Sequence, residues 1–221
     1  MSTVVTIMDR AGWDQCTDVI VAVLPERRTL LWVPRDLLST GYGCRINGVF
    51  AREGHDGLRS ALREYGVEVE HSACIQRGLS EELLAGVSVE VPVDRPLEYW
   101  YPDDPHGLLQ DGKHVVRFDP PSERLEGHRL HEWIGARVAV DRYAGDLERI
   151  RRQHVFVRSL LRSGFDPRPI LSRRRELWTA TPGAAEDLQR VTADWRMELI
   201  DDVEDAMFGE QQVLVLRGAR A

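Results

Sequence analysis

The sequence predicts an α/β fold: one three-layer α/β/α domain over residues 1–221, built around a central, mostly mixed sheet. Three observations support this prediction. Strand-like and helix-like segments interleave along the whole chain. The 221 residues, 43% of them hydrophobic, suffice to bury one core. No repeat, low-complexity tract or linker-like stretch divides the sequence, so we expect a single domain.

The first elements are strands, expected at residues 3–8, 18–24 and 29–33. The run from Asp18 to Leu24 is continuously apolar after its acidic start, which is typical of a strand covered on both faces. The third strand leads into Pro34, Arg35 and Asp36. If the second and third strands form an antiparallel hairpin, Asp18 lies beside the Arg35–Asp36 pair.

Two carboxylates with water and substrate oxygens are a usual environment for Mg²⁺. Asp18 and Asp36 are therefore candidate metal ligands, with Arg35 beside them. The alternative is structural: Asp36 caps the following turn at Leu37 and Leu38, and Asp18 only begins a strand.

The rest of the chain alternates between helical and extended patterns. We expect helices at 56–65, 80–85 (with Ser80 as its cap), 146–163, 184–197 and 199–208, and strands at 67–70, 86–92, 115–118 and 213–216. Residues 125–137 are expected to form a helix or a helix-to-strand element, extended by residues 138–140. Residues 92–121 are rich in proline, aspartate and aromatic residues, which predicts a long functional or covering loop around the short strand. Its consecutive aromatics, Tyr99, Trp100 and Tyr101, either rim an apolar groove or pack at the surface.

The helix expected at 146–163 carries the most distinctive polar residues. Asp146 is a candidate N-cap, and apolar residues recur at helical spacing to form a buried stripe, at Leu147, Ile150, Val157 and Leu161. Arg149 and Gln153 share a face, with Arg152 beside them. Near a helix N-terminus, such a set can grip a phosphate. The alternative is an arginine-rich face in contact with solvent.

Composition limits the function. A formal net charge of −7 and a pI near 5.5 argue against nucleic-acid binding. The cysteines Cys16, Cys44 and Cys74 are odd in number and lack metal-binding spacing, so we expect reduced thiols. His128 and His131 do not have the spacing of a zinc-protease motif. The sequence contains no phosphate-binding glycine loop of the Walker or dinucleotide type and no serine-hydrolase elbow.

We expect no membrane span, because no apolar run approaches about eighteen residues. We also expect no signal peptide, because no basic segment followed by an apolar segment comes before the first strand. A cytoplasmic protein is therefore expected; the alternative is an extracytoplasmic protein whose membrane anchor lies upstream of this sequence.

Taken in order, several segments resemble motifs of the LytR-CpsA-Psr family. They are Asp9–Arg10, Asp18–Val19 on an apolar strand, Val33–Asp36, Arg45–Asn47, Gly86–Pro92, and the hallmark Asp146, Arg149, Arg152 and Gln153. Each motif is weak alone, but their common order and spacing cover essentially the whole chain.

The resemblance implies an apolar pocket for a polyprenyl tail and a pyrophosphate held by arginines and Mg²⁺ or Mn²⁺. It implies phosphotransfer of a glycopolymer from a lipid pyrophosphate to a hydroxyl. By resemblance, phosphate contacts fall on Arg35, Arg45, Asn47, Arg137, Arg149, Arg152 and Gln153, and the metal falls on Asp18 and Asp36. Arg35, Asp36 and Arg149 would be the catalytic residues, and the substrate a lipid-linked or small-molecule pyrophosphate.

Two departures from the family pattern affect this expectation. Cys16 and Gly135 stand where the family usually has arginines, which should weaken pyrophosphate binding. The family's N-terminal membrane anchor also has no counterpart in this sequence. Two further functions therefore remain open: a repurposed soluble enzyme of specialised, natural-product metabolism whose pocket does chemistry other than phosphotransfer, and a non-catalytic binder of prenyl phosphates.

Overall fold

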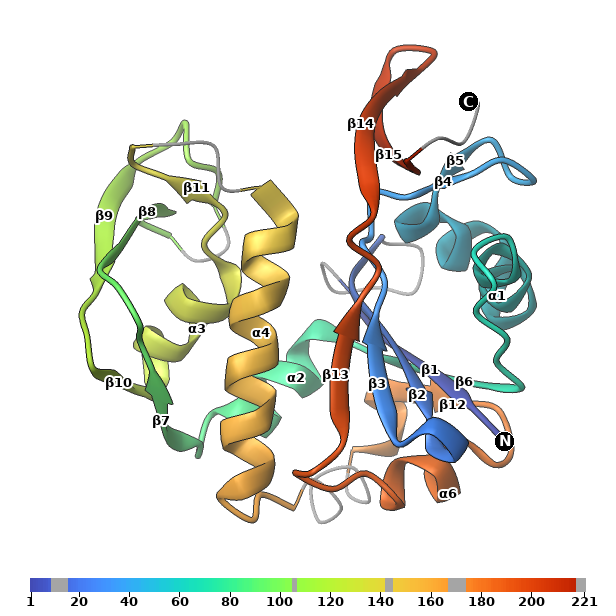
Figure 1. Cartoon of the computed structure of the whole chain (residues 1–221), viewed down its shortest axis with the longest axis horizontal. Helices are drawn as coiled ribbons and strands as arrows, with labels where there is room; N and C mark the ends of the chain where they lie inside the picture. The colour runs from blue at the N-terminus through green and yellow to red at the C-terminus, as the bar shows by residue number, and fades with distance from the viewer. Residues whose placement is uncertain (9–15, 105–106, 142–144, 167–173, 218–221) are drawn as a thin grey trace. The chain divides into compact units, whose positions relative to one another are not determined.

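The computed structural model describes residues 1–8, 16–104, 107–141, 145–166 and 174–217, except the side chains of residues 145 and 146. The chain divides into two compact units (Figure 1): unit 1 is formed by residues 1–81 and 168–221, and unit 2 by residues 82–167. The expectation of a single domain over residues 1–221 remains a prediction.

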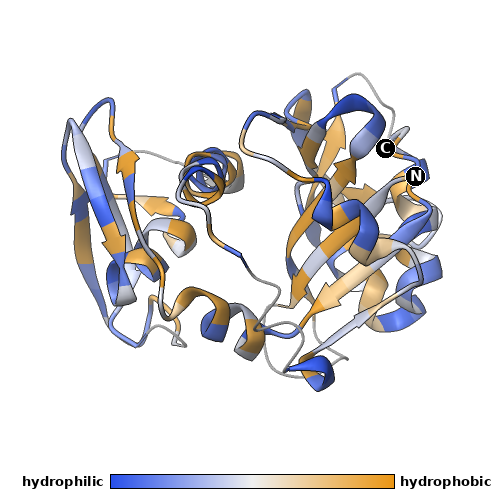
Figure 2. Cartoon of the chain, turned by 90° about the horizontal axis from the view of Figure 1, so that it is seen from below, coloured by the Kyte–Doolittle hydropathy of each residue, from blue (hydrophilic) through white to orange (hydrophobic). Residues whose placement is uncertain are grey.

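Unit 1 is built on a six-stranded sheet with strand order β12-β6-β1-β2-β3-β13. The strands are β1 (Thr3–Met8), β2 (Thr17–Leu24), β3 (Thr29–Trp32), β6 (His71–Ile75), β12 (Trp178–Ala180) and β13 (Arg196–Leu199). The β1–β6 and β3–β13 pairs are parallel and the other pairs are antiparallel, so the sheet is mixed, as predicted. Its strands are largely apolar (orange in Figure 2).

Smaller elements complete unit 1. They are the 3₁₀ turns η1 (Pro25–Arg27) and η2 (Arg175–Leu177), the short pair β4 (Leu38–Ser39) and β5 (Cys44–Arg45), the helices α1 (Ile46–Arg63) and α6 (Ala184–Gln189), and the hairpin β14 (Val203–Phe208) and β15 (Gln211–Leu216). Helix α2 (Arg77–Leu84) runs from unit 1 into unit 2.

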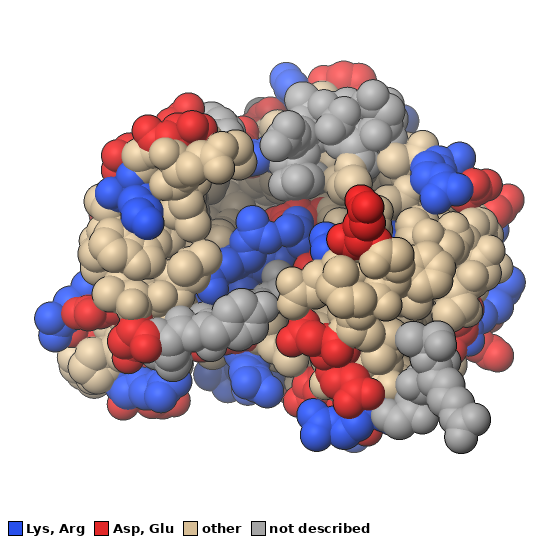
Figure 3. All heavy atoms as spheres, turned by 90° about the horizontal axis from the view of Figure 1, so that it is seen from above, with Lys and Arg blue, Asp and Glu red and all other residues tan. Residues whose placement is uncertain are grey.

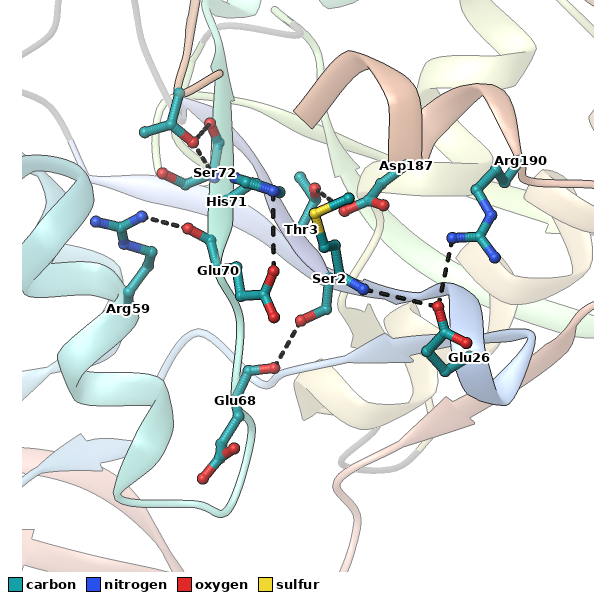
Figure 4. Close-up of polar contacts among 12 residues, drawn as sticks. Ser2, Thr3, Glu26, Arg59, Glu68, Glu70, His71, Ser72, Asp187 and Arg190 are labelled. Atoms are coloured by element: carbon teal, nitrogen blue, oxygen red, sulfur yellow. Dashed lines mark hydrogen bonds and ion pairs between the residues drawn. The ribbon is translucent and has the colours of Figure 1, made fainter. Parts of the chain in front are cut away.

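Helices α1 and α6 lie on opposite faces of the sheet. Ser72 pairs with Val4 across the parallel β1–β6 ladder, so their side chains share a face. On that face the Ser72 hydroxyl lies 2.7 Å from Nδ1 of His55 in α1. Thr3 points to the other face, where its hydroxyl donates to Asp187 of α6 at 2.8 Å (Figure 4). The predicted α/β/α layering is therefore confirmed within unit 1.

Two predictions near α1 and β6 were wrong in their positions. Helix α1 begins at Ile46, ten residues earlier than expected, and kinks at Gly54, whose φ of 65° is left-handed. Residues 67–70 do not form a strand. Strand β6 begins at His71 because the amides of Glu70 and His71 both donate to the Ser2 carbonyl at 2.9 Å, which starts the pairing with β1.

The helices expected at 184–197 and 199–208 were also wrong beyond the short α6. Residues 196–199 form β13, which adds to the free edge of β3. Residues 203–208 form β14, which pairs with β15 across a two-residue turn where Gly209 has a φ of 60°. Partners distant in sequence therefore outweighed the local helical pattern. The closing strand expected at 213–216 is confirmed within β15.

Unit 2 contains two small sheets and two helices. The sheets are β7–β10 and β11-β8-β9, formed by β7 (Ser88–Pro92), β8 (Leu97–Pro102), β9 (Lys113–Phe118), β10 (Ser122–Glu126) and β11 (Val138–Ala139), and the helices are α3 (Gly127–Gly135) and α4 (Gly145–Arg162). Their core includes Tyr99, Phe118, Leu125, Trp133 and Phe156. The Phe118 and Trp133 rings meet edge to face at 4.9 Å.

Residues 92–121 are not the long loop that we predicted, because β8 and β9 pair within them. Tyr99 and Tyr101 alternate onto the buried face of β8 and are 0% and 6% exposed, so these two do not form a surface cluster. Helix α3 begins only at Gly127, since the preceding residues pair with β7. Helix α2 begins at Arg77, and Ser80 lies inside it rather than capping it.

Among the described residues, no helix is long and apolar enough to cross a membrane. On the face drawn in Figure 3, acidic and basic side chains are interspersed along the rim. A basic stripe of the kind that binds nucleic acid was not expected from the net charge of −7.

Candidate functional site

The site predicted in unit 1 lies where β3 ends. Strands β2 and β3 form the predicted antiparallel hairpin, with Val21 opposite Trp32. This register places the start of β2 beside the turn that follows β3. Nη1 of Arg35 donates to Oδ1 of Asp18 at 2.5 Å, with the two side chains 13% and 30% exposed. The expected neighbourhood of Asp18 and Arg35 is therefore confirmed.

Asp36 forms the second ion pair of this turn. Its Oδ1 lies 3.3 Å from Nη1 of Arg45, at the end of β5. The Leu37 amide donates to the Pro34 carbonyl at 3.2 Å, so it is not capped by Asp36. Each predicted metal-binding carboxylate thus lies against its own guanidinium, and formal charges balance locally.

Helix α1 begins against the same turn. The amide of Asn47 donates to the carbonyl of Arg35 at 3.0 Å, and that of Ile46 donates to the carbonyl of Leu37 at 2.8 Å. These bonds satisfy two of the N–H groups that a helix leaves free at its start. The hydroxyl of Thr17 donates to the Asn47 carbonyl at 3.4 Å. The structure therefore brings five predicted residues together around one turn: Asp18, Arg35, Asp36, Arg45 and Asn47.

Strand β15 also contacts this turn, and the sequence did not predict its contribution. The carbonyl of Gln212 accepts hydrogen bonds from Nε of Arg45, at 2.8 Å, and from its Nη2. The amide of Leu214 donates to the backbone carbonyl of Asp36 at 2.9 Å. A backbone carbonyl has no residue-specific signature, so only the position of the hairpin could reveal this contact.

The donor set fits a hard divalent cation such as Mg²⁺. Oδ1 of Asp36 is buried and, among the described residues, accepts no hydrogen bond, although Arg45 lies nearby. A buried carboxylate oxygen without a hydrogen bond keeps the capacity to bind a further cation beside Arg45. Arg35 likewise has a buried Nε without an acceptor in the described part of the chain, so the turn has both acceptor and donor capacity to spare.

The remaining predicted site residues belong to unit 2. Helix α4 spans Gly145–Arg162, as predicted to within a residue at either end, while the Asp146 cap lies outside the described side chains. Arg149, Arg152 and Gln153 are 2%, 4% and 7% exposed, so the solvent-facing alternative for them is wrong. Of the predicted stripe, Ile150 is buried and the other three residues are half-buried.

Arg152 and Gln153 bind the C-terminal end of α3. Nε of Arg152 donates to the carbonyl of Trp133 at 3.0 Å, and its Nη2 donates to the carbonyl of Ala136. Nε2 of Gln153 donates to the carbonyl of Ile134 at 3.2 Å. A cation suits this position because helix C-termini carry unpaired carbonyls and partial negative charge.

Tyr99 covers the other side of the Arg152 guanidinium, whose central carbon lies 4.1 Å from the ring centroid. The Tyr99 hydroxyl donates to Oε1 of Glu148 at 2.6 Å. Burial lowers the pKa of Arg152 and raises that of Tyr99 from their ordinary values. The two groups thus form a buried polar layer between β8, α3 and α4.

The structure describes both positions at which the sequence lacks an arginine of the family pattern, Cys16 and Gly135. Cys16 is exposed with a free thiol. A Cβ on Gly135 would lie 3.4 Å from the Tyr101 ring, so the Tyr101 side chain occupies the space next to this glycine. Arg137 is exposed between α3 and β11. Asp9 and Arg10, the other expected motif, lie outside the described residues.

No protein-family profile and no curated protein matches the sequence. Solved structures do match. TagT bound to LI-WTA is 16% identical, with a TM-score of 0.65 over 98% of this chain and 84% of TagT. TagU of Bacillus subtilis is 14% identical, with a TM-score of 0.61 over 99% of this chain and 90% of TagU.

A transcriptional regulator from Enterococcus faecalis is 18% identical, with a TM-score of 0.65 over 98% of this chain and 81% of the regulator. At these identities the matches establish the fold alone. They confirm the predicted LytR-CpsA-Psr-like α/β fold.

Proposed function

We propose that this chain is a phosphotransferase of LytR-CpsA-Psr type that acts on a prenyl-pyrophosphate-linked glycan or a related pyrophosphate. The observation that carries the proposal is the turn of unit 1, where Asp18, Arg35, Asp36 and Arg45 converge. The fold shared with TagT, which has been solved with LI-WTA bound, supports the same chemistry.

Phosphoryl transfer requires positioning and charge neutralisation more than covalent assistance. In the proposed reaction an acceptor hydroxyl attacks the phosphorus that carries the glycan. The bond from that phosphorus to the bridging oxygen breaks, the prenyl monophosphate leaves, and the hydroxyl proton passes to solvent. Arg35 and Arg45 would donate to phosphate oxygens and offset the charge that develops on the leaving oxygen.

Asp18 and Asp36 would hold Mg²⁺ or Mn²⁺ beside these arginines. When bound, the cation supplies further neutralisation of pyrophosphate charge. Without ligands, each arginine offsets the charge of one carboxylate. When the cation binds the carboxylates, the arginines become available to the pyrophosphate. Cation and pyrophosphate should therefore bind cooperatively.

In unit 2, Arg137 and Arg149 are proposed as further phosphate contacts, on the strength of the family resemblance. Arg152 and Gln153 are proposed mainly as positioning residues, since their donors already hold the end of α3. The apolar pocket for a prenyl tail also remains part of the proposal.

The test is a turnover assay with a short prenyl-pyrophosphate sugar, a carbohydrate acceptor and Mg²⁺, following release of the prenyl monophosphate. Asp36→Asn and Arg35→Lys should each lower kcat/KM at least about a hundredfold, which corresponds to about 2.7 kcal/mol of transition-state stabilisation. Asp194→Asn is the matched control, because it removes one carboxylate from an exposed Arg–Asp pair in the turns that precede β3 and β13.

Turnover that is absent in the parent chain, or equal in the parent and Asp36→Asn, would refute the proposal. If Arg149→Ala is as active as the parent chain, only the phosphate contacts proposed in unit 2 are refuted.

A non-catalytic binder of prenyl phosphates is the second candidate. The loss of an arginine at Gly135, with Tyr101 beside it, favours weaker charge stabilisation in the transition state. Mg²⁺-dependent pyrophosphate binding without any product would support this candidate over the first. A repurposed enzyme of specialised metabolism would instead leave prenyl pyrophosphate unbound at millimolar concentration.

A further inference from the structure

A second cluster of polar side chains lies within unit 2, on β9 and α3. His128 and Glu132 are four residues apart on α3 and share a face, and His114 reaches them from β9. Oε1 of Glu132 lies 3.4 Å from Nε2 of His128 and 3.6 Å from Nε2 of His114. The three ligand atoms all lie within 4.8 Å of one another.

Two imidazoles and one carboxylate are a donor set that zinc uses in proteins. Bonds of about 2.0–2.1 Å to a tetrahedral ion place neighbouring donor atoms about 3.3 Å apart. The two Glu132 distances are close to this value. An ion can therefore be held here with only small movements of the side chains.

Two of the three potential ligands, His114 and Glu132, are oriented by a hydrogen-bond partner. Oδ1 of Asp103 lies 2.9 Å from Nδ1 of His114, which directs the Nε2 lone pair of that ring toward Glu132. Asp103 is itself anchored, because its amide donates to the carbonyl of Gly112 at 3.1 Å. Nη1 of Arg129 donates to Oε2 of Glu132 at 3.0 Å, and Oε1 is the oxygen that faces the histidines.

Packing also restricts the two rings. Tyr101 is buried, and its ring meets His114 and His128 edge to face at 6.1 and 5.9 Å. Glu132 is buried, with its side chain 10% exposed, whereas the side chains of His114 and His128 are 40% and 51% exposed. The carboxylate therefore forms the floor of the cluster, and the open side leaves room for a water ligand.

We propose that His114, His128 and Glu132 bind one divalent transition-metal ion, of which Zn²⁺ fits the donors best, with water completing the coordination. The ion would tether β9 to α3. This site shares no residue with the Asp18–Asp36 turn and uses nitrogen donors, so its test does not depend on the proposed phosphotransfer. His131, the other histidine of α3, is not a ligand.

The test uses the full chain without an affinity tag, freed of metal by chelation and titrated with Zn²⁺ in a calorimeter. One ion should bind per chain and raise the melting temperature. Co²⁺ in place of Zn²⁺ should give the intense visible absorption of a tetrahedral nitrogen–oxygen site, without the near-ultraviolet charge-transfer band of a cobalt–thiolate bond.

His128→Gln should weaken Zn²⁺ binding by more than about a hundredfold and abolish the cobalt spectrum. This side chain is half exposed, so the variant should fold, which circular dichroism checks. Asp103→Asn should weaken binding about ten- to hundredfold through the orientation of His114. His131→Gln is the matched control on the same helix and should bind like the parent chain.

Three results would overturn the proposal. They are the absence of stoichiometric Zn²⁺ binding, binding in folded His128→Gln equal to that of the parent, and a thiolate band that shows cysteine as a ligand. If any is found, the cluster is an ion-pair network around Glu132 and not a metal site.

Discussion

Arg152 and Trp133 bind each other's backbone reciprocally: Nε of Arg152 donates to the Trp133 carbonyl, and the Trp133 indole donates to the Arg152 carbonyl, both at 3.0 Å. These two bonds join α3 to α4 inside unit 2. The most distinctive motif of the sequence thus has a structural role in addition to the phosphate contact that the family resemblance implies. The two roles make different demands on the side chain.

Replacing Arg152 with lysine should lower the free energy of unfolding by about 2–4 kcal/mol, because a buried ammonium cannot reach two carbonyls and stack on Tyr99 together. Urea denaturation of the parent and variant measures this change. Arg151→Lys, at the exposed neighbouring position, should cost under about 0.5 kcal/mol. Equal losses in both variants would contradict the structural role of Arg152.

Thr3 and Asp187 are both buried and join the sheet to α6 by one hydrogen bond (Figure 4). Thr3→Val has nearly the same shape but leaves the carboxylate without this donor, so it should cost about 1–3 kcal/mol. Thr3→Ser keeps the hydroxyl and should lose less. Chemical denaturation compares the three chains, and a valine variant as stable as the parent would show that the bond contributes nothing.

Gly183 precedes α6 with a φ of 91°, and a Cβ there would lie 2.5 Å from Nε2 of His71. Gly183→Ala combines backbone strain with this overlap and should destabilise the protein by about 2 kcal/mol or more. Gly78→Ala, in the uncrowded helix α2, should be neutral or stabilising by up to about 1 kcal/mol. Melting temperatures that fall equally would exclude the steric explanation.

Burial, with the nearby charges of Arg158 and Arg151, lowers the pKa of His154 to about 4. Between pH of about 4 and 6.5, the pKa of a histidine in the unfolded chain, the unfolded chain binds more protons than the folded chain. The free energy of unfolding therefore falls as the pH drops through this window, and above the window His154 costs no stability. His154 as a whole is only half-buried, and screening reduces the effect to about 1 kcal/mol.

His154→Gln should therefore flatten the dependence of the unfolding free energy on pH between about 4.5 and 7. Urea unfolding at several pH values in this range measures the slope. A steep slope in His154→Gln would assign the acid sensitivity to other groups.

Strong local patterns correctly predicted much of the fold. The apolar runs of β1, β2 and β3 and the helical spacing of α4 indicated these elements within one or two residues of their bounds. The hairpin of β2 and β3 then brought Asp18 to Arg35, since antiparallel strands place the start of one beside the end of the other.

Elements whose partners are distant in sequence were predicted poorly. Residues 196–199 and 203–208 carry helix-forming residues, yet they became strands because β3 offered a free edge and β15 a partner. Local propensity amounts to a fraction of a kcal/mol per residue, and pairing with burial outweighs it. The same reason explains the two strands found in the expected loop at 92–121.

The sequence by itself determined which residue types are available: acid–arginine pairs near the ends of apolar strands, a helix that carries arginines near its start, and two histidines in the segment that forms α3. Only the tertiary structure decided their partners, because hydrogen bonds and ion pairs act over a few ångströms between residues that are far apart along the chain. It assigned the donors of Arg152 to the end of α3, and it brought His114 to His128 and Glu132 rather than to His131.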